Sequence, residues 1–152
     1  AKSNEFILAG SGDLAASTKQ LVGDTYFTKD NPLGRNIEYG VREHAMAGIT
    51  NGIVLHSNLK AFASTFLVFS DYMRPSIRLS ALMGIDSVFI FTHDSLLLGE
   101  DGPTHQPVEH LMSLRLIPNL DVVRPSNGNE INYAYRYAFS SNNRPTSIIL
   151  SR

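Results

Sequence analysis

Residues 87–94 read SVFIFTHD, and the four central positions, Val88 to Phe91, are all apolar. Successive side chains of a β-strand point to opposite faces, so a strand with this pattern is apolar on both faces. Such strands are typical of parallel sheets that are covered by helices on both sides. The run therefore predicts a central strand of a parallel sheet.

The segments around this run alternate between strand-like and helix-like patterns. Further strands are expected at residues 6–9, 36–39, 59–64, 120–123 and 147–150. Helices are expected at residues 42–56, 65–83, from about 107, and at 129–139. Ala45, Ile49 and Ile53 form one helical stripe, and Pro75 is expected to kink or divide its helix. This alternation predicts an α/β fold, a parallel sheet with helices on both faces.

Composition fits one globular domain of 152 residues, with 43% hydrophobic and 18% charged residues. Thirteen basic and fourteen acidic residues leave a net charge of −1, which predicts no nucleic-acid partner and no membrane surface. The absence of cysteine excludes disulfides and zinc–thiolate sites. With no secretory segment or long apolar span in the sequence, a cytoplasmic protein is expected. Strands expected close to both ends favour a chain cut from something larger.

Polar and aromatic side chains follow the expected strands, and ligands of open α/β sheets bind beyond the carboxyl ends of the strands. In chain order the residues at this edge are Ser11, Asp13, Ser17, Glu43, Phe66, the segment His93 to His105, Arg124 and Arg152. The sequence therefore predicts a ligand site at this edge of the sheet.

Glu43 stands at the start of the helix expected over residues 42–56. One interpretation is an exposed carboxylate stabilised by the helix dipole, by about 0.3–1 kcal/mol. The other is a partly buried carboxylate that shares a proton with a ligand nitrogen. The sequence leaves both open.

Phe66, Phe69 and Tyr72 are spaced three residues apart and are expected to line a broad face of one helix. They suit either the packing of an aromatic core or a wall that stacks on a flat heteroaromatic ring. Ring pairs contribute about 0.5–1.5 kcal/mol beyond the area that they bury.

The segment THDSLLLGEDGPTHQP, residues 92–107, predicts an ordered ligand loop, because glycine and proline fix its path. His93, Asp101 and His105 suit hydrogen bonding to a polyhydroxylated ligand. We expect no metal site, because neither an HExxH pattern nor a thiolate is present. Arg152 is either a phosphate ligand or a solvated terminal residue.

Four motifs in this order resemble transketolase, specifically its central, pyrimidine-binding domain. They are YGVREHAM, TFLVFSDYMR, FTHDS and GEDGPTHQPVEHL, which begin at residues 39, 65, 91 and 99. The resemblance extends from GSGDL, residues 10–14, to LSR at Arg152, and the last of the four motifs is highly specific. It implies a homodimeric, thiamine diphosphate-dependent transferase of the pentose phosphate pathway. Such an enzyme moves a two-carbon ketol unit from a ketose phosphate to an aldose phosphate.

The resemblance also implies cofactor-binding residues. Glu43 matches the glutamate that hydrogen-bonds a ring nitrogen of the aminopyrimidine and favours the tautomer that deprotonates the thiazolium carbon. Phe66, Phe69 and Tyr72 match the aromatic pocket of the pyrimidine, and Asp13 matches an acid close to the cofactor.

Substrate contacts follow from the same resemblance. His93, Asp101 and His105 match residues that hold the sugar hydroxyls and the reacting carbonyl, so that Glu43 and the two histidines form the catalytic set. Ser17 and Arg152 match contacts to the substrate phosphate. At Ser17 the chain reads AAST, where the family usually has a proline and then Ser/Thr-Asn.

One half of the family's cofactor site has no counterpart in the sequence. No Gly-Asp-Gly followed by Asn-Asn occurs, the pattern that holds the diphosphate and a divalent metal such as Mg²⁺. We therefore expect residues 1–152 to be a single pyrimidine-binding domain, with the diphosphate-binding and C-terminal domains outside this chain. The cofactor would lie against the diphosphate domain of a partner subunit, and the isolated chain would be inactive.

Three alternatives remain open. Deoxyxylulose-phosphate synthase shares the segment DGPTHQ, residues 101–106. The chain could also be a non-catalytic assembly or binding module, or one subunit of a split transketolase.

Overall fold

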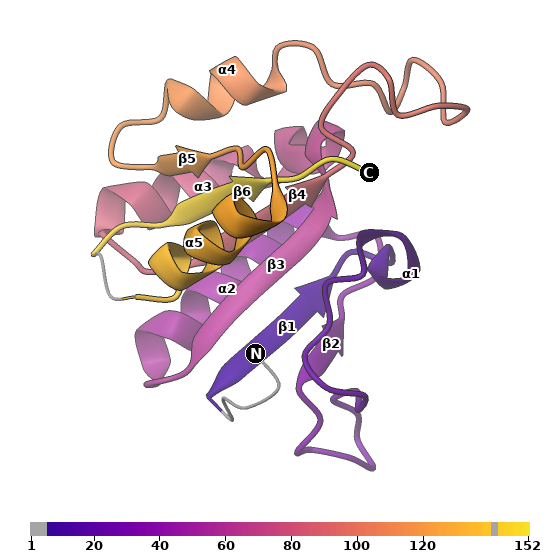
Figure 1. The fold of residues 1–152 in the computed structure, drawn as a ribbon. Helices are drawn as coiled ribbons and strands as arrows, with labels where there is room; N and C mark the ends of the chain where they lie inside the picture. Colours follow the sequence, from indigo (N-terminus) through magenta and orange to yellow (C-terminus); the bar gives the residue numbers. More distant parts are fainter. Residues whose placement is uncertain (1–5, 141–142) are drawn as a thin grey trace.

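Six parallel strands form one sheet in the computed structural model, which describes residues 6–140 and 143–152. The strand order is β2-β1-β3-β4-β6-β5 (Figure 1). The strands are β1 (Ile7–Ser11), β2 (Asn36–Glu38), β3 (Lys60–Phe66), β4 (Val88–Thr92), β5 (Asp121–Val123) and β6 (Thr146–Ile149). The expected parallel α/β sheet is confirmed.

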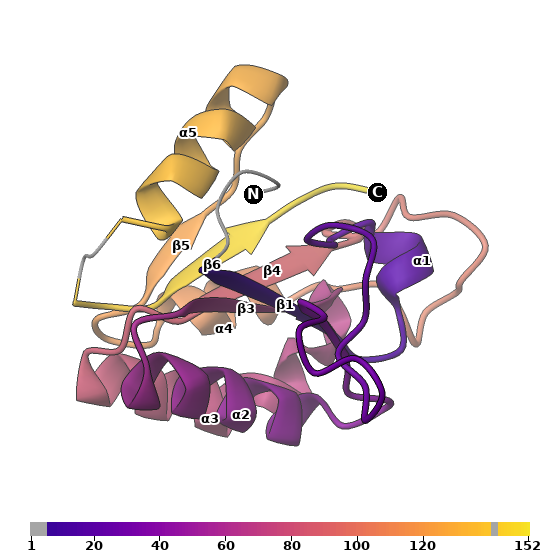
Figure 2. The same ribbon diagram turned by 90° about the horizontal axis from the view of Figure 1, so that it is seen from below.

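Helices cover both faces of this sheet (Figure 2). The helices are α1 (Ala15–Thr18), α2 (Glu43–His56), η1 (Leu67–Phe69), α3 (Ser70–Met83), α4 (His110–Arg115) and α5 (Gly128–Ala138). Helices α2 and α3 lie on one face, and α5 lies on the other. Within the described ranges, no helix has the length and apolar character needed to cross a bilayer.

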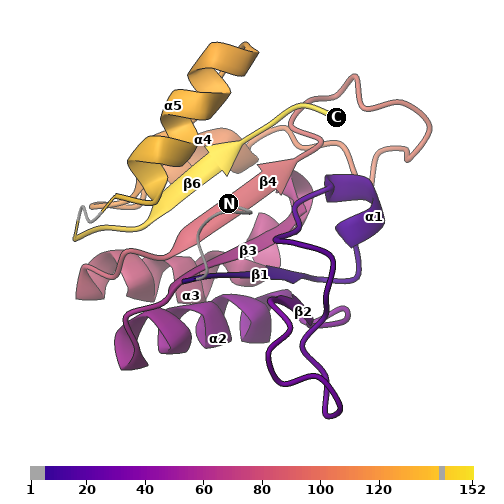
Figure 3. The same cartoon turned by 60° about the horizontal axis from the view of Figure 1, so that its bottom comes forward.

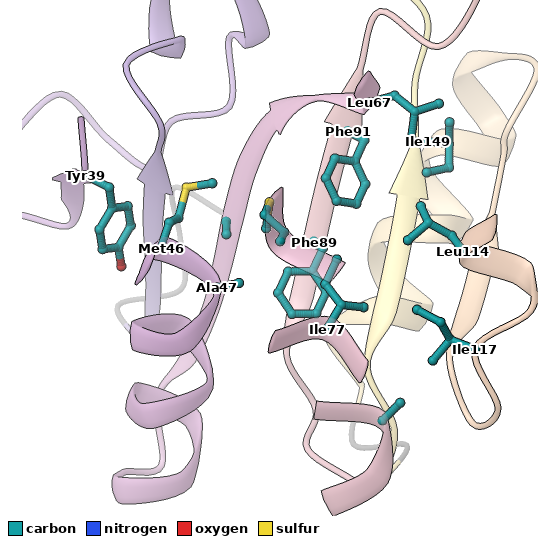
Figure 4. Close-up of a cluster of buried hydrophobic side chains, with 13 residues drawn as sticks. Tyr39, Met46, Ala47, Leu67, Ile77, Phe89, Phe91, Leu114, Ile117 and Ile149 are labelled. Carbon is teal, nitrogen blue, oxygen red and sulfur yellow. The ribbon is translucent and has the colours of Figure 1, made fainter. Parts of the chain in front are cut away.

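Strand β4 has the double-sided burial that its sequence predicted. Phe89 and Phe91 pack with residues of α2 and α3 on one face (Figure 4). Val88 and Ile90 pack on the opposite face with residues of α5 and β6. All four side chains have 0% exposed surface, because β4 lies between β3 and β6 and is covered on both sides.

The helix expected over residues 65–83 begins later than predicted. Thr65 and Phe66 still belong to β3, and the 3₁₀ turn η1 separates them from α3. Pro75 lies within α3, which runs unbroken from Ser70 to Met83, so of the expected kink or division the structure excludes the division. A single missing N–H removes one intrahelical bond, and the packed face of α3 maintains the helix.

Helix α2 forms as predicted, but its apolar stripe does not face the core. Ala45 and Ile49 are exposed, whereas Met46, Ala47 and Thr50 are buried. Apart from Met46, the buried side carries small and polar side chains, because α2 packs closely against β3 and α3.

Two further differences concern the short helices. Helix α4 begins at residue 110 rather than near 107, and α1 was not predicted.

Candidate functional site

A cavity of about 510 Å³ opens at the carboxyl ends of the strands. Its walls come from the segments after β1 and β2, from η1 and α3, and from the loop between β4 and α4. The lining residues are Gly12, Asp13, Leu14, Val41, Glu43, Phe69, Tyr72 and His105. Figure 3 shows α1, this loop and the C-terminus at the same end of the sheet. The cavity therefore lies at the edge where the sequence predicted a ligand site.

Glu43 is the first residue of α2, and only 7% of its surface is exposed. Gly40 adopts a left-handed conformation (φ 65°), which lets the chain turn tightly from β2 into α2. Within residues 6–140 and 143–152, the Glu43 carboxylate has no hydrogen-bond partner, although it faces the cavity. Glu43 is therefore a mostly buried residue at a helix N-terminus whose carboxylate is open to the cavity and available to a ligand.

The three aromatic residues come from three different elements, which corrects the expectation of a single helical face. Phe66 ends β3, Phe69 lies in η1 and Tyr72 lies in α3. Phe69 and Tyr72 line the cavity, and their ring centroids are 6.3 Å apart. Phe66 lies behind them, with its ring stacked at 6.1 Å from that of Phe69. The wall against the cavity is thus formed by Phe69 and Tyr72.

His93 follows β4 directly and connects the aromatic wall to the loop. Its ring stacks on Phe66 with a centroid distance of 3.7 Å, and its Nδ1 lies 2.8 Å from Thr92 Oγ1. Burial lowers the pKa of His93, and the positive charge of Arg152 lowers it further. A neutral imidazole is favoured in this position, and it can both donate and accept a hydrogen bond.

Two glycines with positive φ shape the loop between β4 and α4, Gly99 at 99° and Gly102 at 79°. They confirm the glycine-directed path predicted from the sequence. His105 lies on this loop and contacts Phe69 edge-on, with a centroid distance of 5.4 Å. Asp101 approaches Arg152, with 4.0 Å between Oδ2 and Nη1. Histidine, carboxylate and guanidinium groups therefore meet beside the cavity.

Of the two predicted site residues Asp13 and Ser17, which follow β1, only the first lines the cavity. Asp13 lines the cavity and holds a positive φ of 66°. Ser17 is exposed on α1 and is not among the residues that line the cavity. Sequence reasoning missed Gly12, Leu14 and Val41 as lining residues. Only the position of Gly12, directly after a strand, could have indicated such a role.

One group of potential metal ligands occurs in the part of the chain that the structure describes, namely Asp71, Glu109 and His110. It lies where α3 meets α4. Here His110 Nε2 is 3.0 Å from Asp71 Oδ2, and Arg74 Nη1 donates to the Ser113 carbonyl oxygen at 2.7 Å. These contacts fasten α4, and with it the end of the loop, to α3.

Comparisons with known proteins agree with this geometry. A family model described as "Transketolase, pyrimidine binding domain" matches residues 1–152. A transketolase of Halalkalibacterium halodurans is 52% identical over 153 residues, which cover 100% of this chain and 23% of that protein. A transketolase of Geobacillus stearothermophilus gives the same identity and coverage. The chain thus spans 23% of the length of these relatives.

Solved structures extend the comparison to three dimensions. A transketolase variant of Pichia stipitis in complex with fructose-6-phosphate has a TM-score of 0.92 and 44% identity, covering 96% of this chain and 23% of that one. A protein described as a split-gene transketolase, an inactive β4 tetramer, has a TM-score of 0.74 and 28% identity over 98% of this chain and 46% of its own. Family model, sequence relatives and structures agree that the chain belongs to the transketolase family and matches its pyrimidine-binding domain.

Proposed function

We propose that this chain forms the pyrimidine half of a thiamine diphosphate site in a transketolase. The complete enzyme would transfer a two-carbon ketol unit from a ketose phosphate to an aldose phosphate. The observation that carries the proposal is the mostly buried Glu43, whose carboxylate faces an aromatic-walled cavity and is hydrogen-bonded to none of the described residues.

The residues present fit the aminopyrimidine part of the cofactor. Phe69 and Tyr72 offer a wall for a flat ring, and Glu43 offers a hydrogen-bond acceptor for a protonated ring nitrogen. Thiamine diphosphate, when bound, would supply the carbon nucleophile of the reaction. Glu43 would hold the proton on the ring nitrogen, and the aromatic wall would orient the ring.

Substrate contacts are proposed for the groups beside the cavity. His93, Asp101 and His105 would bind sugar hydroxyls and the reacting carbonyl, with neutral His93 able to donate or accept. Arg152 would bind the substrate phosphate with its planar guanidinium. Ser17 is proposed as a second phosphate contact, on the family resemblance alone.

The rest of the enzyme belongs to the proposal as well. A diphosphate-binding domain of a partner subunit would hold the diphosphate and Mg²⁺, and a C-terminal domain would complete the chain. A cytoplasmic homodimer acting in the pentose phosphate pathway follows from the family resemblance. Sequence identity of 52% to transketolases supports this reading over a deoxyxylulose-phosphate synthase or a non-catalytic module.

Substitution of Glu43 tests the proposal in an assembly that supplies the diphosphate-binding domain. We expect Glu43→Ala and Glu43→Gln to lower turnover by at least about 100-fold, because general acid–base contacts contribute that much. Thiamine diphosphate affinity, measured by calorimetry, should fall only modestly. Glu38→Gln is a matched control, since Glu38 is exposed at the end of β2 and is not among the residues that line this cavity. Near-normal turnover of Glu43→Gln would contradict the proposal.

The donor substrate distinguishes the two enzyme classes. Turnover with a ketose phosphate and ribose phosphate is expected for the transketolase assembly. Turnover with pyruvate and glyceraldehyde phosphate instead would assign the chain to a deoxyxylulose-phosphate synthase.

A further inference from the structure

Arg124 is one of the polar residues at the carboxyl edge, and the proposed function gives it no role. It follows β5 directly, and its Nε donates to Oδ2 of Asp94 over 2.7 Å. The Asp94 side chain is only 9% exposed, whereas that of Arg124 is 43% exposed. Because β6 lies between β4 and β5, this ion pair spans the end of a strand that belongs to neither partner.

Asp94 is the residue directly after His93, whose backbone is unusual. His93 has a φ of 57°, in the left-handed region that residues with a Cβ rarely adopt. Such a conformation persists when the structure on both sides holds it. On the N-terminal side it is held by β4 and by the stacking of the ring on Phe66. On the C-terminal side, the neighbouring side chain is Asp94, anchored by Arg124.

We infer that Asp94 and Arg124 form a positioning pair that keeps the His93 ring stacked on Phe66 beside the substrate. The assignment of His93 to the substrate rests on the proposed function, whereas the positioning itself does not. The pair fixes the loop at its first turn, and Arg152 fixes it again where its Nη1 donates to the Leu98 carbonyl oxygen. Arginines that follow β5 and β6 thus fasten the loop that begins after β4.

A second arginine–aspartate ion pair, between Arg144 and Asp121, serves as a comparison. Arg144 Nη1 lies 3.4 Å from Asp121 Oδ1, with side chains 46% and 22% exposed, near the amino ends of β5 and β6. Surface ion pairs of this kind contribute little to stability. The Asp94 pair differs in its nearly buried carboxylate and in its place next to His93. Its loss should therefore change the geometry of His93 more than the stability of the fold.

Titration of His93 by NMR in the 152-residue chain tests the positioning directly. We expect Arg124→Met and Asp94→Ala both to raise the pKa of His93 toward its ordinary value of about 6.5, because the released ring becomes hydrated. Both variants should also lose the ring-current shift that Phe66 imposes on the His93 ring protons. The other charged groups that act on His93 are Arg152, Asp101 and His105, and none of them is changed.

The two variants separate positioning from the effect of charge alone. Arg124→Met removes a positive charge and Asp94→Ala removes a negative one, so a through-space effect would shift the pKa of His93 in opposite directions. Opposite shifts, or an unchanged ring-current shift, would overturn the inference. Asp94→Asn retains an oxygen acceptor for Arg124. Its His93 pKa and ring-current shift should therefore be close to those of the wild type. Arg144→Met should leave His93 unchanged.

Kinetic measurements test whether the positioning of His93 matters for the substrate. They use the assembly that supplies the diphosphate-binding domain. Arg124→Met should lower kcat/KM for the ketose phosphate roughly ten- to a hundred-fold, the effect of misplacing a contact by about 1 Å, with thiamine diphosphate affinity unchanged. Normal kcat/KM in an active assembly would overturn the functional part. An inactive wild-type assembly with the expected NMR result would instead contradict the proposed function and leave the positioning intact.

Discussion

The environment of single side chains decides what the cavity can do. Glu43 and His93 are both nearly buried, at 7% and 4% exposed, yet they are buried differently. Glu43 faces the cavity and has no hydrogen-bond partner among the described residues, whereas His93 is packed against Phe66 and contacts Thr92. The first arrangement suits a ligand contact, and the second suits a preorganised imidazole whose ring position is fixed.

His93 should make folding stability depend on pH. Its folded pKa is lowered by burial, so the unfolded chain binds a proton more readily. The wild-type chain should therefore lose stability as the pH falls through about 6.5, the ordinary histidine value, until the folded pKa is passed. His93→Asn should lack this component. Urea denaturation of both chains at pH 7.5 and 5.5 checks the prediction, and an identical pH dependence would contradict it.

At the scale of secondary-structure elements, close approaches between backbone and side chains set the packing. Strand β1 passes Tyr39 so closely that a Cβ on Gly10 would lie 2.0 Å from the Tyr39 ring. Tyr39 is itself buried in the core cluster beneath α2. The glycine thus allows the segment after β2 to close against β1, and this brings Glu43 to the cavity.

A pair of glycine substitutions tests this packing. Gly10→Ala should reduce the free energy of unfolding by about 1–3 kcal/mol, because the buried Tyr39 ring must move. Gly52→Ala is the matched control, since Gly52 lies in α2 with open space around its Cβ position. It should stabilise the chain by about 0.4–1 kcal/mol through a smaller unfolded-state entropy. Thermal and urea unfolding measure the change in the free energy of unfolding for each variant. Equal changes in the two variants would contradict the prediction.

At the scale of the whole molecule, the cavity is proposed to form one side of a site that another domain completes. Its lining has an aromatic wall and the two carboxylates of Asp13 and Glu43, and the one group of potential metal ligands among the described residues lies elsewhere, between α3 and α4. The sheet brings cofactor-binding and substrate-binding candidates to one edge. The groups that would hold a diphosphate belong to the proposed partner domain.

The isolated 152-residue chain should bind thiamine diphosphate weakly and show no turnover, because the diphosphate contacts are proposed to lie outside it. Adding a diphosphate-binding domain should raise the affinity at least about ten-fold, since the second set of contacts then acts on the same ligand. Calorimetry and a coupled ketol-transfer assay measure the two quantities. Ketol transfer by the chain alone would refute the prediction.

The sequence by itself determined the alternation of the six strands with the longer helices along the chain, the parallel sheet and the edge that carries the candidate site. These follow from local periodicity, from glycine and proline at the ends of elements, and from motifs such as GEDGPTHQP, residues 99–107. Only the tertiary structure decided that the mostly buried Glu43 faces the cavity, that His93 stacks on Phe66, and that Arg124 reaches Asp94. It also decided which face of α2 is buried, and this is not the face of the apolar stripe seen in the sequence. The physical reason is that burial and pairing depend on residues distant in the chain, which local patterns do not encode.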